Sequence, residues 1–446
     1  MTDRGATGDD GVARGCHPAR RERTVKPLAI VSMHASPIAD LGAGENGGMN
    51  VYIRAVCEEL GRRGIPTEVF TRRSTPDGPG RIRLAETSWV TRLAVGPPAN
   101  VDKSQLFDLL PDFTDAVIAE QRRRRSTYSL IHSHYWLSGW AASRLRDEWK
   151  LPWFHTFHTL ARVKNERAAE GATLEPDHRI AVEQAVVRNS DRLIASSLQE
   201  AEDLVRLYGA SRERVTVVAP GVDLRLFGPR PTEQLRAELK LGMDRVVMFA
   251  GRLERLKGAE TLIRAFAILA RDRVLDGPLA LVIIGGDSQN GASESRETGG
   301  EQARLQQLAR ELGIAAQVRF VGSVDQPMLA SYLSLASVCV VPSYSESFGL
   351  VALEAEACGT PVVAARVGGL PTIVKDGLTG FTLVSRDPAR YADRIARILA
   401  DEELRRCFSR RSMLVASQFT WQVTVDRLLA EYTAPRQPEL QPAVAG

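Results

Sequence analysis

The feature that most constrains this chain is a regular alternation of short apolar runs, each the length of a strand, with segments of helical periodicity. The first unit passes from an apolar run at Leu28–Met33 through a glycine-rich stretch at Gly42–Gly48 into apolar residues that recur at helical spacing from Met49 to Leu60. Gly64 ends that unit, and the next strand is expected at Thr67–Thr71. Strand, glycine loop, helix and strand in this order predict an α/β protein with a doubly wound parallel sheet.

The alternation runs to about residue 218 and restarts after a turn at Pro220-Gly221. Because 446 residues are too many for one compact core, we predict two doubly wound domains, at residues 27–219 and 220–420. Residues 1–26 are rich in Gly, Arg and Asp and lack the apolar stretch of a signal peptide, so we expect a disordered tail there and a flexible tail at 433–446. Further strands are expected at Ser88–Val95, Leu130–Ser133, Trp153–Thr156, Arg192–Ala195, Val215–Val218, Val246–Ala250, Leu279–Ile284, Val318–Val321, Val338–Val341, Val362–Ala365 and Phe381–Val384. Further helices are expected at about 104–120, 138–148, 176–189, 198–207, 259–270, 301–312, 327–335, 350–357 and 388–399.

Composition and charge exclude several classes of protein. Hydrophobic residues make up 44% and charged residues 25%, close to the average for soluble domains, and no run of about 18 apolar residues predicts a transmembrane helix. A net charge of +4 over this length is too small to indicate nucleic-acid binding. The run Arg122–Arg125 lacks interleaved aromatic residues on which bases could stack, so it does not indicate a nucleic-acid-binding protein either. Five cysteines without CxxC spacing argue against a disulfide framework or a zinc site, which predicts a cytoplasmic location.

Histidines gather where predicted strands end. Five of the seven follow three different strands, and they are His34, His132, His134, His155 and His158. Because ligands bind beyond the carboxyl ends of parallel strands, we expect these side chains to lie around one site. No third carboxylate or cysteine ligand accompanies a histidine pair, so a catalytic metal is not favoured.

The glycine pair Gly47-Gly48 precedes a predicted helix and has two interpretations. It is either a flexible turn or an anion site, because amides at a helix N-terminus are unpaired and carry partial positive charge. The spacing is not the GxGxxG fingerprint of dinucleotide binding, and no acidic residue ends the second strand where a ribose would need one. The sequence therefore argues against a dehydrogenase.

Three loops in the second half carry polar residues at strand ends. One places Arg252 and Lys257 where they either hold a diphosphate or are only surface cations. Another carries Glu346, with Glu354 eight residues on in the following helix, and carboxylates accept hydrogen bonds from sugar and ribose hydroxyls. The third contains Gly368-Gly369, which suits either the close approach of a nucleotide or only a turn.

These motifs resemble those of retaining glycosyltransferases of family 4, which have the GT-B fold. The resemblance runs from about Pro27 to Tyr432 and is most specific at Glu346 and Glu354, spaced E-x7-E, and at the segments Gly251–Gly258 and Pro220–Asp223. In the first half it is closest to members that glycosylate D-inositol 3-phosphate in mycothiol biosynthesis. The segments that carry this part of the resemblance are Ser32–His34, Gly47–Tyr52 and Ser133–Gly139.

The resemblance implies two domains facing each other across a cleft, with the acceptor bound by the first and a UDP-sugar by the second. A last helix at about 421–432 would return to the first domain. The implied reaction transfers N-acetylglucosamine from UDP-N-acetylglucosamine to 1D-myo-inositol 3-phosphate with retention at the anomeric carbon. No cofactor is required, and the binding of magnesium and the formation of a homodimer are left open. Neither nucleic acid nor stable membrane insertion is expected.

The resemblance also implies a role for each matching residue. Catalysis would involve His158, Glu346, Arg252 and Lys257. The donor site would comprise Gly48, Arg252, Lys257, Val324, Glu346, Ser347, Phe348, Gly349, Leu350 and Glu354. The acceptor site would comprise His34, Glu45, Asn46, Gly47, Gly48, Met49, Asn50, Lys103, Tyr135, Thr159 and Arg179, with Lys103, Tyr135, Thr159 and Arg179 holding the phosphate.

The sequence departs from the family pattern just before the glycine pair. Asp40-Leu41-Gly42 and Glu45-Asn46 stand where a Gln-Pro-Gly stretch and an Asp-Ala are usual. Since these positions lie near the acceptor, the first alternative is a transferase like sucrose-phosphate synthase, with a phosphorylated sugar as acceptor. An alternative from another class is a GT-B epimerase or a protein that only binds a nucleotide sugar, although the complete set of charged donor-site residues argues against lost catalysis.

Overall fold

The computed structural model describes residues 25–38, 47–99, 101, 103–168, 174–242, 245–272, 275–287 and 300–434, with residues 103 and 104 described by their backbone alone. The tails expected at 1–26 and 433–446 therefore lie almost entirely outside the described residues. So do Glu45, Asn46 and the departure at Asp40-Leu41-Gly42.

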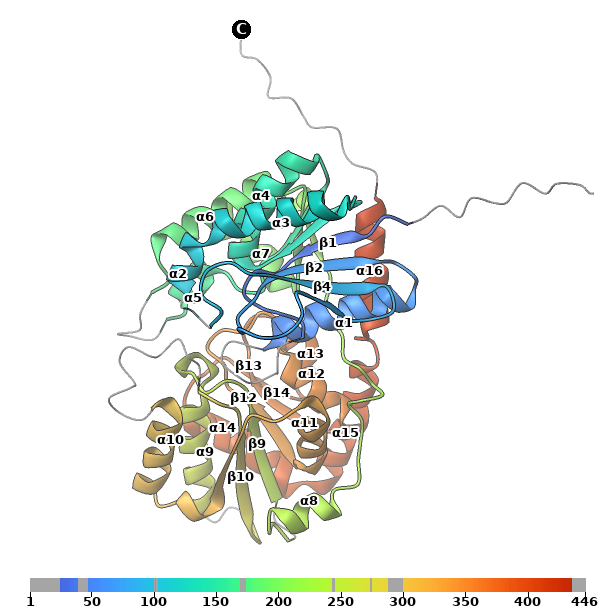
Figure 1. Cartoon of the computed structure of the whole chain (residues 1–446). Helices are drawn as coiled ribbons and strands as arrows, with labels where there is room; N and C mark the ends of the chain where they lie inside the picture. Colours follow the sequence, from blue (N-terminus) through green and yellow to red (C-terminus); the bar gives the residue numbers. More distant parts are fainter. Residues whose placement is uncertain are drawn as a thin grey trace, which may run out of the picture.

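Two parallel sheets organise the described residues, one in each lobe of the molecule (Figure 1). The strands of the first sheet are β1 (Leu28–Val31), β2 (Thr67–Arg72), β3 (Arg81–Arg83), β4 (Ser88–Leu93), β5 (Ile131–His134), β6 (Trp153–Thr156), β7 (Arg192–Ala195) and β8 (Val215–Val217). The strands of the second are β9 (Arg245–Ala250), β10 (Leu279–Ile284), β11 (Val318–Gly322), β12 (Val338–Val341), β13 (Val362–Ala365) and β14 (Gly380–Leu383).

The strand order reverses once near the middle of each sheet. In the first sheet the order is β3-β4-β2-β1-β5-β6-β7-β8, and among its described strands only β3 pairs antiparallel. In the second the order is β11-β10-β9-β12-β13-β14, with parallel pairing throughout the described strands. The reversals fall between β1 and β5 and between β9 and β12, where a doubly wound sheet opens a crevice for ligands. The predicted fold class, two doubly wound domains, is confirmed.

Helices cover both sheets. Those packed on the first sheet are α1 (Gly48–Arg62), α2 (Lys103–Asp108), α3 (Leu110–Arg124), α4 (Tyr135–Trp149), α5 (Ala161–Glu166), α6 (Asp177–Asn189), α7 (Leu198–Tyr208) and α16 (Trp421–Thr433), with a short 3₁₀ turn η1 (Arg212–Arg214). Those of the second lobe are α8 (Glu233–Glu238), α9 (Ala259–Asp272), α10 (Gly300–Glu311), α11 (Gln326–Leu335), α12 (Leu350–Ala357), α13 (Leu370–Ile373), α14 (Pro388–Ala400) and α15 (Glu402–Ala416), with the 3₁₀ turns η2 (Arg255–Lys257) and η4 (Ala315–Gln317).

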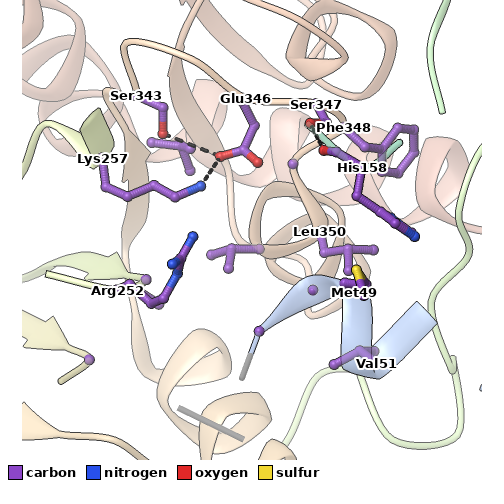
Figure 2. Close-up of a pocket in the computed structure, with 18 of the residues that line it drawn as sticks. Met49, Val51, His158, Arg252, Lys257, Ser343, Glu346, Ser347, Phe348 and Leu350 are labelled. Carbon is purple, nitrogen blue, oxygen red and sulfur yellow. Dashed lines mark hydrogen bonds and ion pairs between the residues drawn. The ribbon is translucent and has the colours of Figure 1, made fainter. Parts of the chain in front are cut away.

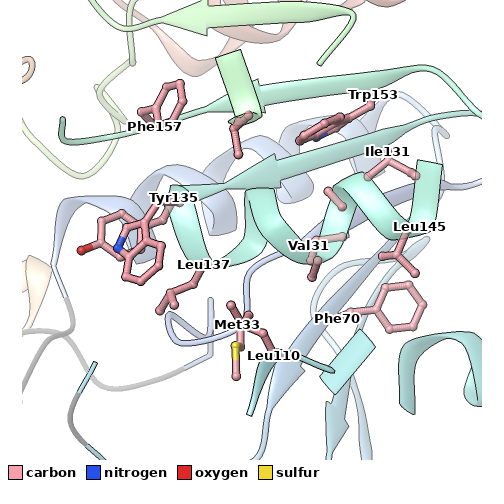
Figure 3. Close-up of a cluster of buried hydrophobic side chains, with 14 of the residues drawn as sticks. Val31, Met33, Phe70, Leu110, Ile131, Tyr135, Leu137, Leu145, Trp153 and Phe157 are labelled. Atoms are coloured by element: carbon pink, nitrogen blue, oxygen red, sulfur yellow. The ribbon is translucent and has the colours of Figure 1, made fainter. Parts of the chain in front are cut away.

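The central strands are apolar runs because both of their faces are buried. All four residues of β1 and all six of β10 are inaccessible or nearly so, as expected for a parallel sheet covered by helices on both sides. In the first lobe, Val31, Met33, Phe70 from β2 and Trp153 from β6 belong to one buried apolar cluster (Figure 3). This core fixes the ends of β1, β5 and β6 relative to one another.

The last helix crosses from the second lobe back to the first. In Figure 1, α16 lies beside α1, whereas α15 stays in the lower lobe. Trp421, Val425 and Leu428 are buried in a cluster that also contains Ile30 and Tyr52. Burial of this apolar stripe holds the helix on the first sheet.

The two chain segments that connect the lobes run against each other. Val222 donates a backbone hydrogen bond to Phe419 at 2.9 Å. A Cβ atom at Gly221 would lie 2.3 Å from the backbone nitrogen of Trp421, so the crossing of the two segments requires glycine at this position.

Several helices differ from the sequence-based expectation. The helix expected at 104–120 is divided into α2 and α3, because Pro111 in the first turn of α3 has no N–H to donate to a preceding turn. The helices α5, α8 and α15 were not expected, whereas α13 follows the pair Gly368-Gly369 as expected. Two of the unexpected helices, α5 and α8, have six residues each, which is too short to show a helical period.

Candidate active site between the two sheets

A cavity of about 390 Å³ lies between the two lobes, beyond the carboxyl ends of β1 and β5 on one side and of β9 and β12 on the other. Both strand-order reversals therefore face the same space. Most of the residues expected at a donor or acceptor site line it. These are His34, Gly47, Gly48, Met49, Tyr135, His158, Thr159, Arg252, Lys257, Val324, Glu346, Ser347, Phe348, Gly349, Leu350 and Glu354.

Three of the expected site residues whose backbones are described are not among the residues that line the cavity. Asn50 is buried behind its wall, where its side chain accepts from the amide of Gly47 at 3.1 Å and donates to the carbonyl of Ser36 at 2.8 Å. Arg179 is buried one layer below Thr159, with 1% of its side chain exposed. Lys103 is the first residue of α2, and its side chain lies outside the described part of the chain.

Two helix N-termini meet at the cavity. Gly48 opens α1, and Leu350 opens α12 from the opposite lobe. A Cβ atom on Gly48 would lie 3.2 Å from the Cδ1 atom of Leu350, so glycine permits the close approach of the two helices. Because unpaired amides at a helix N-terminus attract negative charge, this end of the cavity favours an anionic ligand.

Lys257 and Glu346 form an ion pair on the wall of the second lobe (Figure 2). The distance from Nζ of Lys257 to Oε2 of Glu346 is 2.7 Å. Arg252 lies below this pair and makes its own ion pair with Glu254 at 3.2 Å. The loops that carry them fit together because Gly258 passes so close to Pro342 that a Cβ atom would lie 2.3 Å from its carbonyl oxygen. Two cations thus lie side by side, a suitable arrangement for a diphosphate.

Glu354 lies deeper in the same wall, on α12. It is 6% exposed, and burial raises the pKa of its carboxyl to about 7. A carboxylate there could accept hydrogen bonds from two neighbouring hydroxyls, and its protonated form could accept fewer.

His158 faces the cavity from the first lobe with its backbone in the left-handed region, at φ 61°. Its Nε2 atom lies 3.0 Å from Nδ1 of His134, and its ring meets the edge of Tyr52 at 5.3 Å between centroids. Burial lowers the pKa of His158 to about 3, so the imidazole is neutral at pH 7. The outlying backbone conformation and the fixed ring together indicate a positioned functional side chain.

A seam of hydrogen bonds joins the two lobes beside His158. Ser347, in the loop before α12, donates to the backbone carbonyl of His158 (Figure 2). The carbonyl of Ser347 in turn accepts from the hydroxyl of Ser197 at 3.1 Å. The loop of Glu346 is therefore held directly against the histidine of the opposite lobe.

The other histidines support this wall. His132 lies behind His134, with ring centroids 4.4 Å apart, and pairs with the hydroxyl of Tyr432 on α16 at 2.6 Å. His155 pairs with Ser133 inside the first domain at 2.7 Å. Only His34 and His158 of the five line the cavity, so the strand ends converge but three of the histidines are part of its support.

Arg179 is the centre of a buried charged cluster beneath the acceptor side of the cavity. Its guanidinium pairs with Glu183 at 2.8 Å and with Glu175 at 2.7 Å, and it donates to the hydroxyl of Thr159 at 3.1 Å. The same guanidinium lies 5.0 Å from the ring centroid of Tyr135. Arg179 thus contacts two of the other residues expected at the phosphate, Thr159 and Tyr135.

The glycine pair Gly368-Gly369 lies directly against the loop of Glu346. A Cβ atom at Gly368 would lie 1.5 Å from the carbonyl oxygen of Glu346, and one at Gly369 would lie 2.6 Å from Cα of Phe348. Close packing against backbone therefore requires glycine at both positions, a reason that neither of the two interpretations from the sequence included.

The lining residues that were not predicted from the sequence include two with large polar side chains from the first lobe, Lys164 and Tyr52. Lys164 reaches the cavity from α5, and its ammonium pairs with Glu175 at 2.7 Å. Tyr52 lies on α1 with a buried hydroxyl that has no hydrogen-bond partner in the described structure. In the sequence, Tyr52 looks like a core residue of an amphipathic helix. Its position one turn after Gly48 was the feature that could have placed it at the cavity.

Neither a metal cluster nor a membrane-spanning helix occurs in the described part of the chain. No group of three or more His, Cys, Asp or Glu side chains there could hold a metal ion. No helix there is both long enough and apolar enough to cross a bilayer.

Comparison with known proteins identifies the family. Residues 47–221 match the model of the glycosyl transferase 4-like domain, and residues 231–413 match that of glycosyl transferases group 1. The chain is 42% identical over 424 residues to a D-inositol 3-phosphate glycosyltransferase of Corynebacterium jeikeium, covering 93% of this chain and 99% of that protein. It is 44% identical to a protein of the same name from Geodermatophilus obscurus, covering 93% and 91% of the two chains.

Solved structures agree with this assignment. Sucrose-phosphate synthase from Thermosynechococcus elongatus superposes with a TM-score of 0.82 at 36% identity and covers 91% of this chain and 98% of its own. Anabaena HepE in complex with UDP and glucose superposes with a TM-score of 0.71 at 19% identity, covering 91% and 99%, and so shows the same fold. The chain belongs to the glycosyltransferase family in which a 4-like domain precedes a group 1 domain, and it is a glycosyltransferase of the GT-B fold.

Proposed function

We propose that the protein transfers N-acetylglucosamine from UDP-N-acetylglucosamine to 1D-myo-inositol 3-phosphate, with retention of configuration, as the first step of mycothiol biosynthesis. The observation that carries the proposal is identity of 42–44%, over more than nine tenths of the chain, to proteins named D-inositol 3-phosphate glycosyltransferase. The contact of Tyr135, Thr159 and Arg179 at the acceptor side of the cavity supports it.

The donor half of the proposal assigns the charged wall of the second lobe to the nucleotide sugar. Arg252 and Lys257 bind the diphosphate, and Glu354 accepts from the ribose hydroxyls. Glu346 and the amides at the start of α12 hold the sugar. The proposal requires no metal ion, because the two cations already face the diphosphate position.

The transfer breaks the bond between the anomeric carbon and the diphosphate oxygen and forms a bond from that carbon to an acceptor oxygen. In the proposed same-face attack, the acceptor proton passes to the departing diphosphate oxygen. Arg252 and Lys257 stabilise the negative charge that grows on this diphosphate. His158 is neutral, so it contributes a hydrogen bond near the sugar without adding charge.

A second candidate has support of its own. The similarity to sucrose-phosphate synthase at 36% identity and a TM-score of 0.82 favours a phosphorylated sugar, such as fructose 6-phosphate, as the other acceptor to test. Both candidates share the donor wall and differ in what occupies the acceptor side.

A competition assay decides between them. UDP release from UDP-N-acetylglucosamine and UDP-glucose is measured with inositol 3-phosphate, free inositol, fructose 6-phosphate or no acceptor. We expect kcat/KM for inositol 3-phosphate to exceed that for free inositol by well over tenfold, since charged hydrogen bonds contribute about 1.5–3 kcal/mol each. A preference for fructose 6-phosphate would establish the second candidate, and UDP release without acceptor would point to an epimerase-type reaction.

A further inference from the structure

His158 has one ring nitrogen left for a ligand. Its Nε2 atom lies 3.0 Å from Nδ1 of His134, so this nitrogen is already used inside the protein. A half-turn of the ring would place a carbon atom opposite His134 and break the hydrogen bond. Because His158 lines the cavity, this bond fixes Nδ1 as the nitrogen that a bound molecule can meet.

His134 is placed by the fold and does not itself line the cavity. It is the last residue of β5 and is 2% exposed. The next residue, Tyr135, has a φ of 73°, and His158 has a φ of 61°, so both have left-handed backbone conformations. Such conformations persist where the surrounding structure imposes them, and they gather at functional sites. Two outlying strand ends thus bring the two imidazoles together.

The pair of His134 and His158 is not a link in a longer hydrogen-bonded chain through His132. The Nδ1 atom of His132 pairs with the hydroxyl of Tyr432 at 2.6 Å, and its Nε2 atom pairs with the hydroxyl of Thr156 at 3.0 Å. Both nitrogens are therefore used elsewhere, and His132 packs on His134 through its ring, with centroids 4.4 Å apart. A proton between His134 and His158 is shared by these two rings.

The protonation of His134 decides what His158 offers to the cavity. Burial lowers the pKa of His158 to about 3, and burial with the neighbouring histidines holds the pKa of His134 well below its usual value, so both rings are neutral at pH 7. A neutral imidazole has one N–H donor and one acceptor nitrogen. If His134 donates to Nε2, His158 carries its own proton on Nδ1 and is a donor toward the cavity. If His134 accepts, Nδ1 of His158 is a bare lone pair.

The surroundings of His158 favour the donor. Arg252, Lys257 and the N-termini of α1 and α12 make the cavity a site for an anionic ligand, and the donor substrate carries a diphosphate. A lone pair on Nδ1 would repel oxygen atoms of such a ligand, whereas an N–H group attracts them. Because the imidazole is neutral, it supplies this hydrogen bond without competing as a third cation for the diphosphate.

We propose that His134 is a positioning residue for the transfer reaction: it donates its Nδ1–H to Nε2 of His158 and so holds His158 in the tautomer that presents Nδ1–H to the donor sugar. His134 touches no substrate and acts through His158. The inference rests on the proposed function in one respect, the contact of His158 with the sugar.

Nitrogen NMR tests the tautomer directly. The full-length protein is labelled with ¹⁵N-histidine and saturated with UDP at pH 7, and the ring signals are assigned from their loss in His134→Asn and His158→Gln. Protonated and unprotonated ring nitrogens give separate signals. We expect Nδ1 of both rings to be protonated and Nε2 of His158 to be unprotonated. A proton on Nε2 of His158, or on both of its nitrogens, would overturn the proposal.

Two variants of nearly equal shape test the role in turnover. His134→Leu cannot donate a hydrogen bond to His158 and should lower kcat by about tenfold, while KM for both substrates stays within about threefold, because most binding contacts lie elsewhere. His134→Asn carries an amide near the position of Nδ1 and should keep kcat within about threefold of the parent. Equal effects of leucine and asparagine, whether both harmless or both harmful, would contradict the assigned role.

A double variant and a matched control separate this role from packing. His158→Ala should lower kcat, and the addition of His134→Leu should lower it no further, because His134 acts through His158. His155→Leu replaces another buried histidine, which pairs with Ser133 at 2.7 Å, and should lower the melting temperature with little change in kcat. If His155→Leu lowers kcat as much as His134→Leu does, the loss reflects packing and the inference is wrong.

The outcomes distinguish this inference from the proposed function. If the parent enzyme prefers another acceptor or another UDP-sugar, the proposed function fails, and the same variants then test His134 with the substrates that the enzyme accepts. If the parent uses UDP-N-acetylglucosamine and inositol 3-phosphate but His134→Leu retains full turnover, the inference on His134 alone is wrong.

Discussion

Among single side chains, Lys257 is the one whose removal should reduce turnover most clearly. Its ammonium lies 2.7 Å from Glu346 in the wall that we assign to the donor diphosphate. Lys257→Ala should lower turnover at saturating donor by about 10²–10³, because a charge-assisted contact made in the transition state is worth roughly 2–4 kcal/mol. The control is Arg255→Ala, which removes an exposed cation from the same 3₁₀ turn. A turnover within twofold of the parent would exclude the role given to Lys257.

Glu354 makes donor binding depend on pH. Burial raises its pKa to about 7, so the free protein binds an extra proton there between about pH 4.5 and 7, and this carboxyl's contribution to stability falls as the pH rises. The ionised form is the better partner for ribose hydroxyls. The affinity for UDP-N-acetylglucosamine, whose diphosphate does not titrate in this range, should therefore increase by about tenfold from pH 6 to pH 8.

Calorimetry on the parent and on Glu354→Gln checks this expectation. The variant should bind the donor more weakly at pH 8 and should lose the dependence on pH. His158 does not contribute to the profile because its pKa is about 3. An equally steep profile in Glu354→Gln would assign the titration to another group.

At the level of helices, α16 contributes both apolar and polar contacts to the first domain, whereas its neighbour in sequence, α15, lies in the second lobe (Figure 1). The hydroxyl of Tyr432 lies 2.6 Å from Nδ1 of His132, which is fully buried, while Tyr432 is partly buried. Tyr432→Phe leaves the imidazole nitrogen without this partner and should cost about 1–3 kcal/mol of unfolding free energy. Urea unfolding measures it, with Arg427→Ala on the exposed face of the same helix as the control. Equal stability of the two variants would show that the pair contributes nothing.

What the sequence could predict depends on the kind of element. Strands buried on both faces, such as β10 and β12, are continuous apolar runs, and their bounds were predicted to the residue. The short helix α5 shows no period, so Lys164 went unnoticed although Thr159 five residues before it was expected at the site. Hydrophobic periodicity indicates which face of a helix or strand is buried. It cannot detect a six-residue helix, which is too short to repeat the pattern and whose position depends on the elements around it.

The partners of Arg179 show the same limit for the site. The residue was expected at the phosphate from the family resemblance, but its pairing with Glu175 and Glu183 was not foreseen. The two glutamates lie four residues before and four residues after Arg179, and this i, i+4 spacing on a helix was the feature from which the ion pairs could have been predicted. The seam from Ser347 to His158 had no such signal, because it joins two loops 189 residues apart.

For the whole molecule, the crossing of the two connecting segments sets how the lobes are held together. A Cβ atom at Gly221 would lie 2.3 Å from the nitrogen of Trp421. Gly221→Ala should therefore force the segments apart, lower the melting temperature and reduce turnover, because a shift at this junction moves the two walls of the cavity relative to each other.

The matched control is Gly228→Ala, whose Cβ atom would lie 3.7 Å from the carbonyl of Leu224, an ordinary contact. Thermal unfolding and steady-state turnover of both variants give the comparison. If Gly221→Ala matches Gly228→Ala in both measurements, the junction tolerates displacement and does not set the position of the two cavity walls.

The return of α16 to the first lobe also has a consequence for synthesis of the chain. When residue 219 leaves the ribosome, every described strand of the first sheet has been made, but Trp421, Val425 and Leu428, which cover one of its apolar clusters, have not. About 200 residues remain, and at roughly 5–20 residues per second they take tens of seconds to translate. Throughout that interval the nascent first domain exposes the groove that α16 will fill, so it reaches its native core only after the second domain has emerged.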